Sequence, residues 1–557
     1  MHSAFDRSTT LELHLKWTQA FVACGISFNV IRNHVFQDAL LCTAKAGSKF
    51  TIPPYNKMRT EYLDKVKHTM EQGISRTVLD FIPIFGCTIA LDGWTSCQKK
   101  PLINIMCICP RGIVFLEAID TSLKEKTSSY LAKLYERAIA RVGGPKYVTA
   151  ICTDNASNFK NAGLMIEEKY PEMTWVPCAA HTLNLLLKDI GKMSFVQPTL
   201  IEANHIVKFI REHQFTYALF RTKSDKCLQI FCATRFATSY YVLERLQLVR
   251  AALQETIADR RFQAWMLKHP NHVISASKCA SSINSTSFWS KVQKILSITK
   301  PFVELLRIVD TDKFVMGKVY WLMSCAIKHV ESHEKLSVRE RKDISFCATE
   351  RWTMMHTPLH GAAFALDPAF QLHEQSTNHE VYGNFKKVCM MLLPGDEGKD
   401  AFHQRSQFSN RIDSFGDEWC LDAIKHLSPP MWWKEHGSQT FELQHIAVRV
   451  LSVAASSGSC ERNWSAYDFI HSKRRNRLKA TRASALVYCF CNMRLLHKPH
   501  TLATRATEVA MQMPPKQTHE VVSEERGSED EDEWEIDSSA SDIEEIDDII
   551  PVLTSDN

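Results

Sequence analysis

Apolar residues recur at steps of three and four through the first part of the chain. This spacing is found in LELHLKWTQAFVACGI and in YLDKVKHTMEQGISRTVLDF, and it predicts amphipathic helices. The stretch GSKFTIPPYN, with its glycine and two prolines, separates the two patterns. We therefore expect a helical N-terminal region over residues 1–85.

Five short runs between residues 87 and 178 have the composition of β-strands. The tight PRG between the second and third runs suits a hairpin. Helical patterns follow the last three runs, at about residues 128–142, at about 155–170 and from residue 179 on. The expected strands are CTIALD (87–92), LINIMCICP (102–110), GIVFLEAID (112–120), YVTAICTD (147–154) and TWVPC (174–178).

Helical patterns dominate from about residue 240 to 430, and no run there favours a strand. Another helix is expected at residues 440–453, and SSGS at 456–459 interrupts the pattern. The stretch ASALVYCFCNMRLL (483–496) is apolar on nearly all sides, which indicates burial against protein. After His497 a linker leads into an acidic segment that is too charged to pack, so we expect it to be disordered.

Three strands, a helix and then a further strand is the order of the ribonuclease H-like fold. We therefore predict an α/β protein whose ribonuclease H-like core is interrupted by a large all-α insertion, with a helical N-terminal region and a disordered acidic C-terminal tail. The expected domains are residues 1–85 (helical region), 86–236 (first part of the core), 237–430 (helical insertion), 431–500 (completion of the core) and 501–557 (linker and tail).

The net charge of +5 hides a basic body and an acidic tail. Fifteen acidic residues and one arginine lie between Glu524 and Asn557, a net charge of −14. The 67 basic and 62 acidic residues of the whole chain leave 66 and 47 for the rest, a net charge of +19. A positive body favours polyanions such as nucleic acid, and it equally serves solubility, so charge alone leaves both explanations open.

Cysteine usage and hydropathy indicate an intracellular, soluble protein. The 18 cysteines are scattered through apolar runs, which fits buried thiols in a reducing compartment and makes disulfides unexpected. No segment approaches the roughly 20 apolar residues that cross a bilayer, and MHSAFDRSTT lacks the layout of a secretory signal. We expect no membrane partner.

Asp92 and Asp154 each end an expected strand. In the predicted fold the first and fourth strands are neighbours, so both carboxylates would project from one edge of the sheet. Two carboxylates that close repel each other unless a cation lies between them, and Mg²⁺ or Mn²⁺ suits such oxygen ligands. Two such ions about 3.5–4 Å apart support phosphoryl transfer. Two simpler explanations stay open at this point. Asp92-Gly93 fits an ordinary turn at the end of a strand, and Asp154-Asn155 fits an ordinary cap of the helix that follows.

Four motifs, in order, resemble those of the hAT (hobo, Activator, Tam3) transposase superfamily. They are LDGWTS (91–96), CTDNASN (152–158), CAAHTLNLLLKDI (178–190) and SSGSCERNWS…KRRNRL (456–478). The chain is most similar to plant-type members with a central domain of unknown function and a hAT C-terminal dimerisation region, over about residues 10–500. The resemblance implies a ribonuclease H-like core that cleaves and joins DNA at transposon ends, with divalent metal ions held by an Asp, Asp, Glu set.

Carried over by motif, Asp92, Asp154 and Glu461 are the predicted catalytic and metal-binding residues, with Mg²⁺ or Mn²⁺ as the cofactor. Taken alone, Glu461 is an ordinary first-turn acid, where a helix N-terminus favours its ionised form. Cys178 and His181 match the family's C-x-x-H, which implies a role in placing DNA, while packing and capping explain them equally. A zinc site would need two more ligands, so we expect no structural zinc.

The remaining predicted contacts concern DNA and a second subunit. Arg235 and Phe236 match an Arg-Trp position at which the family's Trp supports a displaced base, although core packing explains Phe236 as well. The basic string at 471–479 suits phosphate contact or nuclear import, so we expect a nuclear protein that binds DNA. Its predicted DNA-contacting residues are Lys473, Arg474, Arg475 and Arg477. Homodimerisation, or a higher oligomer, is expected through Trp432, Trp433, Trp464, Leu486, Phe490 and Leu495, which ordinary core packing also explains.

Family members commonly begin with a BED-type zinc finger. Only Cys24 and Cys42 precede residue 80, and no C-x-x-C occurs there, so the finger is absent from this sequence. The copy is truncated, the gene model is incomplete, or a host has kept the protein for another use. We therefore predict a hAT-type transposase, with a domesticated or defective protein that dimerises and binds DNA without catalysis as the alternative.

Overall fold

The computed structural model describes residues 7–95, 99–231, 237–372, 378–470 and 480–496. The chain separates into two compact units at the Val66–Lys67 bond. This bond lies within helix α4 (Leu63–Thr77).

The first unit is helical, as the sequence predicts. It contains α1 (Arg7–Cys24), α2 (His34–Ala46), α3 (Tyr55–Lys57) and the start of α4. Asn33 caps α2, because its side chain accepts hydrogen bonds from the backbone N–H groups of the second and third helical residues. Phe21 is 4% exposed and packs against Phe28 and Phe36, with ring centroids 6.2 and 5.8 Å away.

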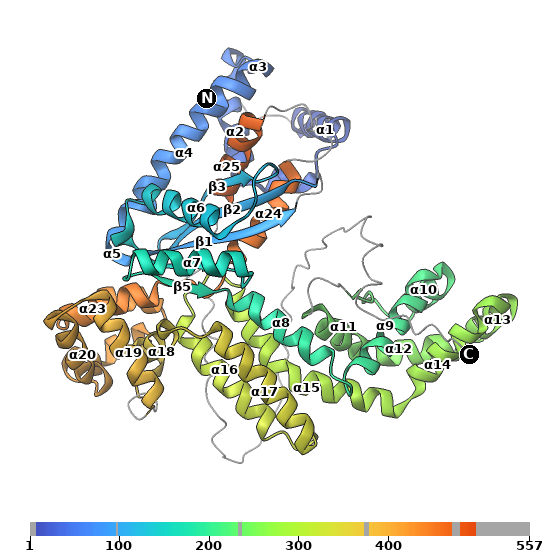
Figure 1. Cartoon of the computed structure of the whole chain (residues 1–557). Coiled ribbons are helices and arrows are strands. Elements are labelled where there is room, and N and C mark those ends of the chain that lie inside the picture. The colour runs from blue at the N-terminus through green and yellow to red at the C-terminus, as the bar shows by residue number, and fades with distance from the viewer. Residues whose placement is uncertain (1–6, 96–98, 232–236, 373–377, 471–479, 497–557) are drawn as a thin grey trace. The chain divides into compact units, whose positions relative to one another are not determined.

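The second unit is built on a five-stranded mixed sheet (Figure 1). Its order is β3-β2-β1-β4-β5, with antiparallel pairing of β1 with β2 and of β2 with β3, and parallel pairing of β1 with β4 and of β4 with β5. All five predicted strands are confirmed, and so is the expectation that the first and fourth are neighbours. The strands are β1 (Cys87–Thr95), β2 (Pro101–Cys109), β3 (Gly112–Asp120), β4 (Val148–Thr153) and β5 (Thr174–Pro177).

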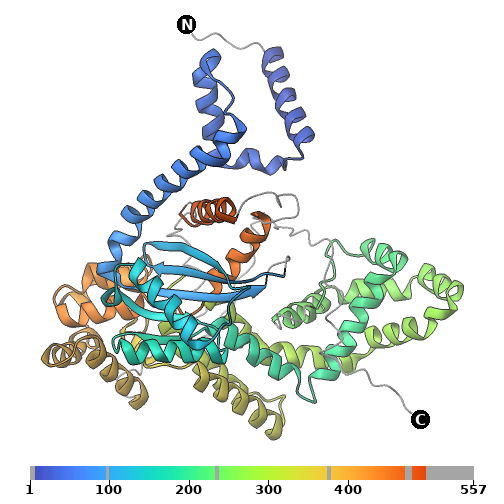
Figure 2. The same cartoon turned by 45° about the horizontal axis from the view of Figure 1, so that its top comes forward.

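Helices cover both faces of this sheet. Figures 1 and 2 show α6 (Ser128–Arg141) and α7 (Ser157–Lys169) across one face, and α24 (Gly458–Ile470) and α25 (Ala480–Leu496) across the other. The helix α7 approaches β5 closely at Gly163, where an added Cβ would lie 2.2 Å from Cδ1 of Trp175. Glycine is therefore needed at this contact.

The edge strand β3 is held by a side chain of α25. The Asn492 amide accepts a hydrogen bond from the backbone N–H of Phe115 (2.9 Å) and donates one to the Phe115 carbonyl (3.0 Å). Asn492 is fully buried, so it occupies the place that a sixth strand would take at this residue.

The described residues between β5 and α24 are helical, as predicted for residues 240–430. The helices α9 and α10, which precede the predicted insertion, pack on helices within it: α9 packs on α11 and α14, and α10 packs on α12. The helices are α8 (Ala179–Gly191), α9 (Gln197–Glu212), α10 (Gln214–Arg221), α11 (Ala237–Leu248), α12 (Arg250–Ala258), α13 (Arg260–Lys268), α14 (Val273–Asn284), α15 (Thr286–Val309), α16 (Met316–Glu331), α17 (Val338–Met355), α18 (Pro358–Leu366), α19 (His379–Leu392), α20 (Asp396–Ser409), α21 (Glu418–Ala423), α22 (Pro429–His436) and α23 (Phe441–Leu451). The short α5 (Ile82–Phe85) leads into β1.

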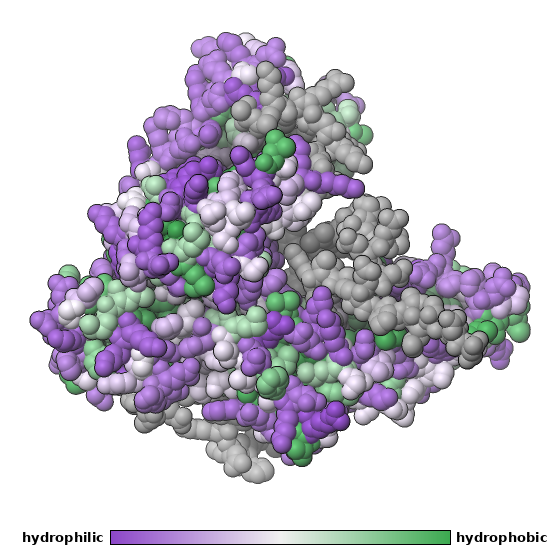
Figure 3. All heavy atoms as spheres, in the orientation of Figure 1, coloured by the Kyte–Doolittle hydropathy of each residue, from purple (hydrophilic) through white to green (hydrophobic). Residues whose placement is uncertain are grey.

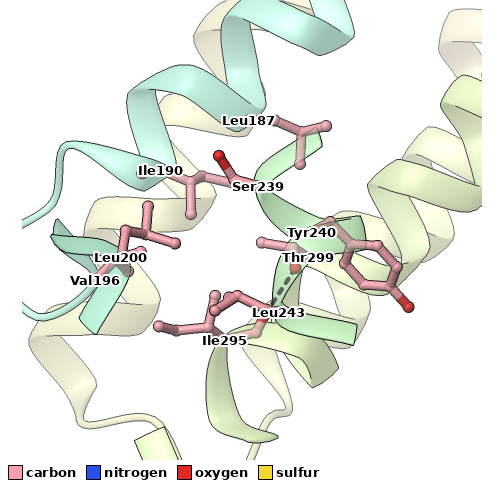
Figure 4. A pocket seen from close by; sticks show the side chains of 10 residues that line it. Leu187, Ile190, Val196, Leu200, Ser239, Tyr240, Leu243, Ile295 and Thr299 are labelled. Carbon is pink, nitrogen blue, oxygen red and sulfur yellow. Dashed lines mark hydrogen bonds between the residues drawn. The ribbon is translucent and has the colours of Figure 1, made fainter. Parts of the chain in front are cut away.

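The core joins the insertion through α8, which contacts α15 and α17. Arg351 of α17 forms an ion pair with Asp189 of α8. A small, mostly apolar pocket lies between α8, α9, α11 and α15, and Figure 4 shows Leu187, Ile190 and Leu243 among its lining side chains. This pocket contains no ionisable group other than a tyrosine.

The surface mixes hydrophilic and hydrophobic residues on the face shown in Figure 3, where hydrophobic residues form scattered patches. Across the part of the chain that the structure describes, no helix combines the length and the apolar character needed to cross a bilayer.

We expect alanine to have opposite effects at two helical glycines. Gly163→Ala should lower the free energy of unfolding by about 1–3 kcal/mol, because the new methyl group overlaps Trp175. Gly73→Ala in α4 should raise it by roughly 0.5–1 kcal/mol, since nothing lies within 4 Å of its added Cβ and alanine favours the helix. Calorimetric melting of both variants tests this pair, and a shift in the same direction would contradict the packing at α7.

Candidate active site

Asp92 lies within β1, at the point where this strand loses its neighbour β4. The parallel register ends at Ala90 opposite Cys152, and β1 continues along β2 as far as Thr95. Asp92 is half-buried. Burial raises its pKa to about 7; a hydrogen bond from Trp464 opposes this rise, and the charges of Glu461 and Asp154 add to it.

Asp154 follows β4 directly, two residues beyond Cys152, and is therefore level with Asp92 in the continued register. Its Oδ1 accepts a hydrogen bond from the backbone N–H of Ala156 (3.1 Å). The following helix α7 begins at Ser157, and Ala156 occupies its N-cap position without a side-chain cap bond. The Asp154 carboxylate thus shapes the turn before α7 and does not cap the helix.

Glu461 reaches the same place from far along the chain, in the first turn of α24. The segment before α24 is attached to the core by hydrogen bonds from the Ala454 N–H to Thr88 Oγ1 (3.0 Å) and from the Ser457 N–H to Cys178 Sγ (3.3 Å). The helix itself is tied to β2, where the Asn104 side chain donates to the Cys460 carbonyl (3.1 Å). Because Asn104 pairs directly with Asp92, this bond brings Glu461 to the strand position that carries Asp92.

Arg462 attaches α24 to the helical insertion. Its guanidinium donates to Oδ1 of Asp310 (2.9 Å), just after α15, and forms an ion pair with Asp312. The insertion therefore contacts α24 at the residue that follows Glu461.

Glu461 and Asp154 both lie within electrostatic range of Asp92. Both Glu461 and Asp154 raise the pKa of Asp92, which requires their charges to be near it. Such a set of oxygen donors fits Mg²⁺ or Mn²⁺ in chemistry and charge. Among the described residues, no three His, Cys, Asp or Glu side chains are grouped closely enough to hold a metal ion.

Lys126 is a residue of this site that the sequence did not indicate. It precedes α6, and its carbonyl accepts a hydrogen bond from Asn158 of the CTDNASN motif (2.9 Å). Its Nζ lies 3.7 Å from the position of a Cβ at Gly93. Burial lowers the pKa of Lys126, and the charges of Asp154 and Asp92 oppose this shift. A cation therefore stands beside the carboxylates, on a loop that has no recognisable pattern.

Cys178, for which a DNA contact is predicted, is fully buried. Its Sγ accepts a hydrogen bond from the backbone N–H of His181 (3.5 Å) at the start of α8 and another from Ser457. The C-x-x-H spacing therefore matches that of a helix cap, the alternative that the sequence left open. His181 is half-buried.

Three tryptophans predicted for dimerisation lie inside this chain. Trp432 and Trp433 are fully buried, and their indole N–H groups donate to the carbonyls of Cys420 and Leu366. Trp464 is 6% exposed and donates to Asp92. This burial fits the core packing that the sequence left open for these residues. Leu486, Phe490 and Leu495 are half-buried along α25, whose other side packs on β3.

The predicted DNA-contacting residues Arg235, Phe236, Lys473, Arg474, Arg475 and Arg477 lie outside the described residues, as does the acidic tail.

Two regions of the chain match known families. Residues 53–206 match the family described as Domain of unknown function (DUF659), and residues 406–493 match the hAT family C-terminal dimerisation region. The chain is also similar to the Zea mays protein named "Putative AC transposase", with 20% identity over 470 residues that cover 71% of this chain and 55% of that relative. It thus spans about half the length of the curated relative that it matches.

Replacing the buried charge of Asp92 should stabilise the metal-free protein at high pH. The folded-state pKa of about 7 lies above the usual value, so the stability that Asp92 contributes is full below pH 4 and is lost as the pH rises through 7. The free energy of unfolding of Asp92→Asn, relative to that of the wild type, should therefore rise by roughly 2 kcal/mol from pH 5 to pH 8. Denaturant unfolding in EDTA measures this gain, with Glu168→Gln on the exposed side of α7 as the control. A gain that is the same at both pH values would contradict the buried charge.

Proposed function

The chain belongs to the hAT transposase family, as its four motifs predict, and from this premise we propose that it is a metal-dependent enzyme that cleaves DNA and transfers strands at transposon ends. In this proposal the five-stranded sheet is a ribonuclease H-like core, and the catalytic residues are Asp92, Asp154 and Glu461. The observation that carries the proposal is that Glu461 and Asp154, which are 307 positions apart in the chain, both lie close enough to Asp92 for their charges to raise its pKa.

The carboxylates have the character that divalent metal binding requires. Holding acidic groups together in a half-buried site is unfavourable: burial raises the pKa of Asp92 to about 7, and the charges of Glu461 and Asp154 add to this rise. We infer that Mg²⁺ or Mn²⁺ is the cofactor, held by Asp92, Asp154 and Glu461. When bound, such ions activate a water or hydroxyl group for attack on a phosphodiester and stabilise the leaving oxygen.

The remaining residues of the site orient and support the carboxylates. Trp464 and the Gly93 N–H donate hydrogen bonds to Asp92, and the turn at Ala156 holds Asp154. Lys126 supplies a positive charge beside the aspartates, which suits contact with a DNA phosphate. The net charge of +19 outside the acidic tail favours DNA as the partner, and the basic string at 471–479 supports action in the nucleus.

Loss of any one carboxylate should abolish cleavage. We expect Asp92→Asn, Asp154→Asn and Glu461→Gln each to lower the rate by about 10³-fold or more, because each removes a metal ligand and its charge. The assay uses the full chain, Mg²⁺ or Mn²⁺, and DNA bearing the inverted repeats that flank the gene. Glu168→Gln is the matched control and should cleave as the wild type does.

Cleavage that persists in Asp154→Asn would reject this site. An absence of cleavage by the wild type, with DNA binding and self-association retained, would instead identify a transposase-derived protein that has lost catalysis.

We further propose that the C-terminal region mediates self-association through the outer side of α25. Leu486 and Phe490 are one turn apart and half-buried there. Leu486→Asp combined with Phe490→Asp should convert a dimer into a monomer by light scattering, because charge is unfavourable in an interface core. Ser484→Asp, an exposed position of the same helix, should leave the mass unchanged. A wild-type monomer, or a dimer in all variants, would contradict this surface.

A further inference from the structure

Trp464 links the strand that carries Asp92 to the helix that carries Glu461. We propose that it is a positioning residue of the active site, which holds the Asp92 carboxylate against α24 beside Glu461. This inference rests on the function proposed above and adds a residue to its machinery. The structure therefore gives Trp464 a role distinct from the subunit contact expected from sequence.

A short hydrogen bond carries the proposal. Nε1 of Trp464 donates to Oδ2 of Asp92 at 2.7 Å. The indole is 6% exposed and Asp92 is half-buried, so water competes little for this bond. A bond to a carboxylate in such surroundings is among the stronger neutral-donor hydrogen bonds and fixes the direction of the acceptor.

The location of Trp464 suits this task. It follows Glu461 by three residues, so both side chains lie on the same side of α24. Trp94 follows Asp92 by two residues, so both lie on the same side of β1. The two indole rings stack with centroids 4.9 Å apart and planes 20° apart, and Tyr467 packs edge-on against both. The stack locks the donor in place next to Asp92.

An indole is well suited to a metal-binding carboxylate. Its N–H is a donor only and carries no charge, so it orients Asp92 while leaving the negative charge available to a cation. An arginine or lysine at this position would neutralise that charge and compete with the metal. Metal ligands are commonly held by such outer hydrogen bonds, and their loss weakens metal affinity by roughly 10–100-fold.

The chain offers a matched pair of variants. Trp464→Phe and Trp94→Phe each shorten one ring of the same stack, but only the first removes the donor to Asp92. We expect Trp464→Phe to weaken Mn²⁺ binding by about 10-fold or more, measured on the full chain without DNA by the electron paramagnetic resonance signal of free Mn²⁺. Trp94→Phe should weaken it far less. A parallel change in DNA cleavage at low Mn²⁺, recovered at high Mn²⁺, should accompany the loss.

A second readout reports the contact itself. The chain has 12 tryptophans, and in protein labelled with 5-fluorotryptophan the resonance missing from Trp464→Phe identifies Trp464. Asp92→Ala should shift this resonance, because its hydrogen-bond acceptor is lost. Mn²⁺ should broaden it before that of Trp419, which is 84% exposed on α21.

The outcomes separate the two proposals. Mn²⁺ binding that is equally affected by Trp464→Phe and Trp94→Phe, or by neither, would overturn the positioning role while leaving the metal site intact. A wild-type chain that binds no Mn²⁺, or whose binding is unchanged in Asp92→Ala, would overturn the proposed function and the positioning role with it.

Discussion

The attachment of α24 to the strand pair β1–β2 is the constraint on which the rest of the structure depends. The bonds from Ala454 to Thr88, from Asn104 to Cys460 and from Trp464 to Asp92 fix the helix that carries Glu461 on the sheet. These contacts join residues 366, 356 and 372 positions apart. The docking of α24 on the sheet requires the C-terminal part of the chain. Because it closes so long a loop, we expect this docking to be slow relative to the local pairing of β1, β2 and β3.

The carboxylates of the candidate site lower the stability of the fold. Three carboxylates drawn towards one another in a half-buried place repel, and the chain offsets this with donors that carry no charge (Trp464 and the Gly93 N–H) and with one nearby cation (Lys126). The surroundings, with β1 in the middle of the sheet and the buried Cys178 at the N-cap of α8, limit how far the acids can move apart. This is the arrangement expected where function, and not folding, selects the residues.

The sheet and two of the three candidate carboxylates, Asp92 and Asp154, could be predicted because their signals lie in short stretches of sequence. Strand composition and turn residues identified β1 to β5, and strand adjacency paired Asp92 with Asp154 before any family was considered. Glu461 required the family resemblance, because a first-turn glutamate is common and its neighbours are set by tertiary contacts. Lys126 lies on a loop without a pattern, and the partner of the Trp464 indole is 372 positions away, so neither role was accessible. The C-x-x-H of Cys178 and His181 suggested a DNA contact, while the hydrogen bond from the His181 N–H to the buried Cys178 thiol shows that this spacing also forms a helix cap.

The fully buried Asn492 has a consequence for assembly. An exposed edge strand invites strand addition, both from a partner and from an aggregating copy. Asn492 saturates the backbone of Phe115 on β3 with one side chain, so that edge is closed at its centre. A strand from another copy therefore cannot pair with β3 at Phe115 unless Asn492 is displaced.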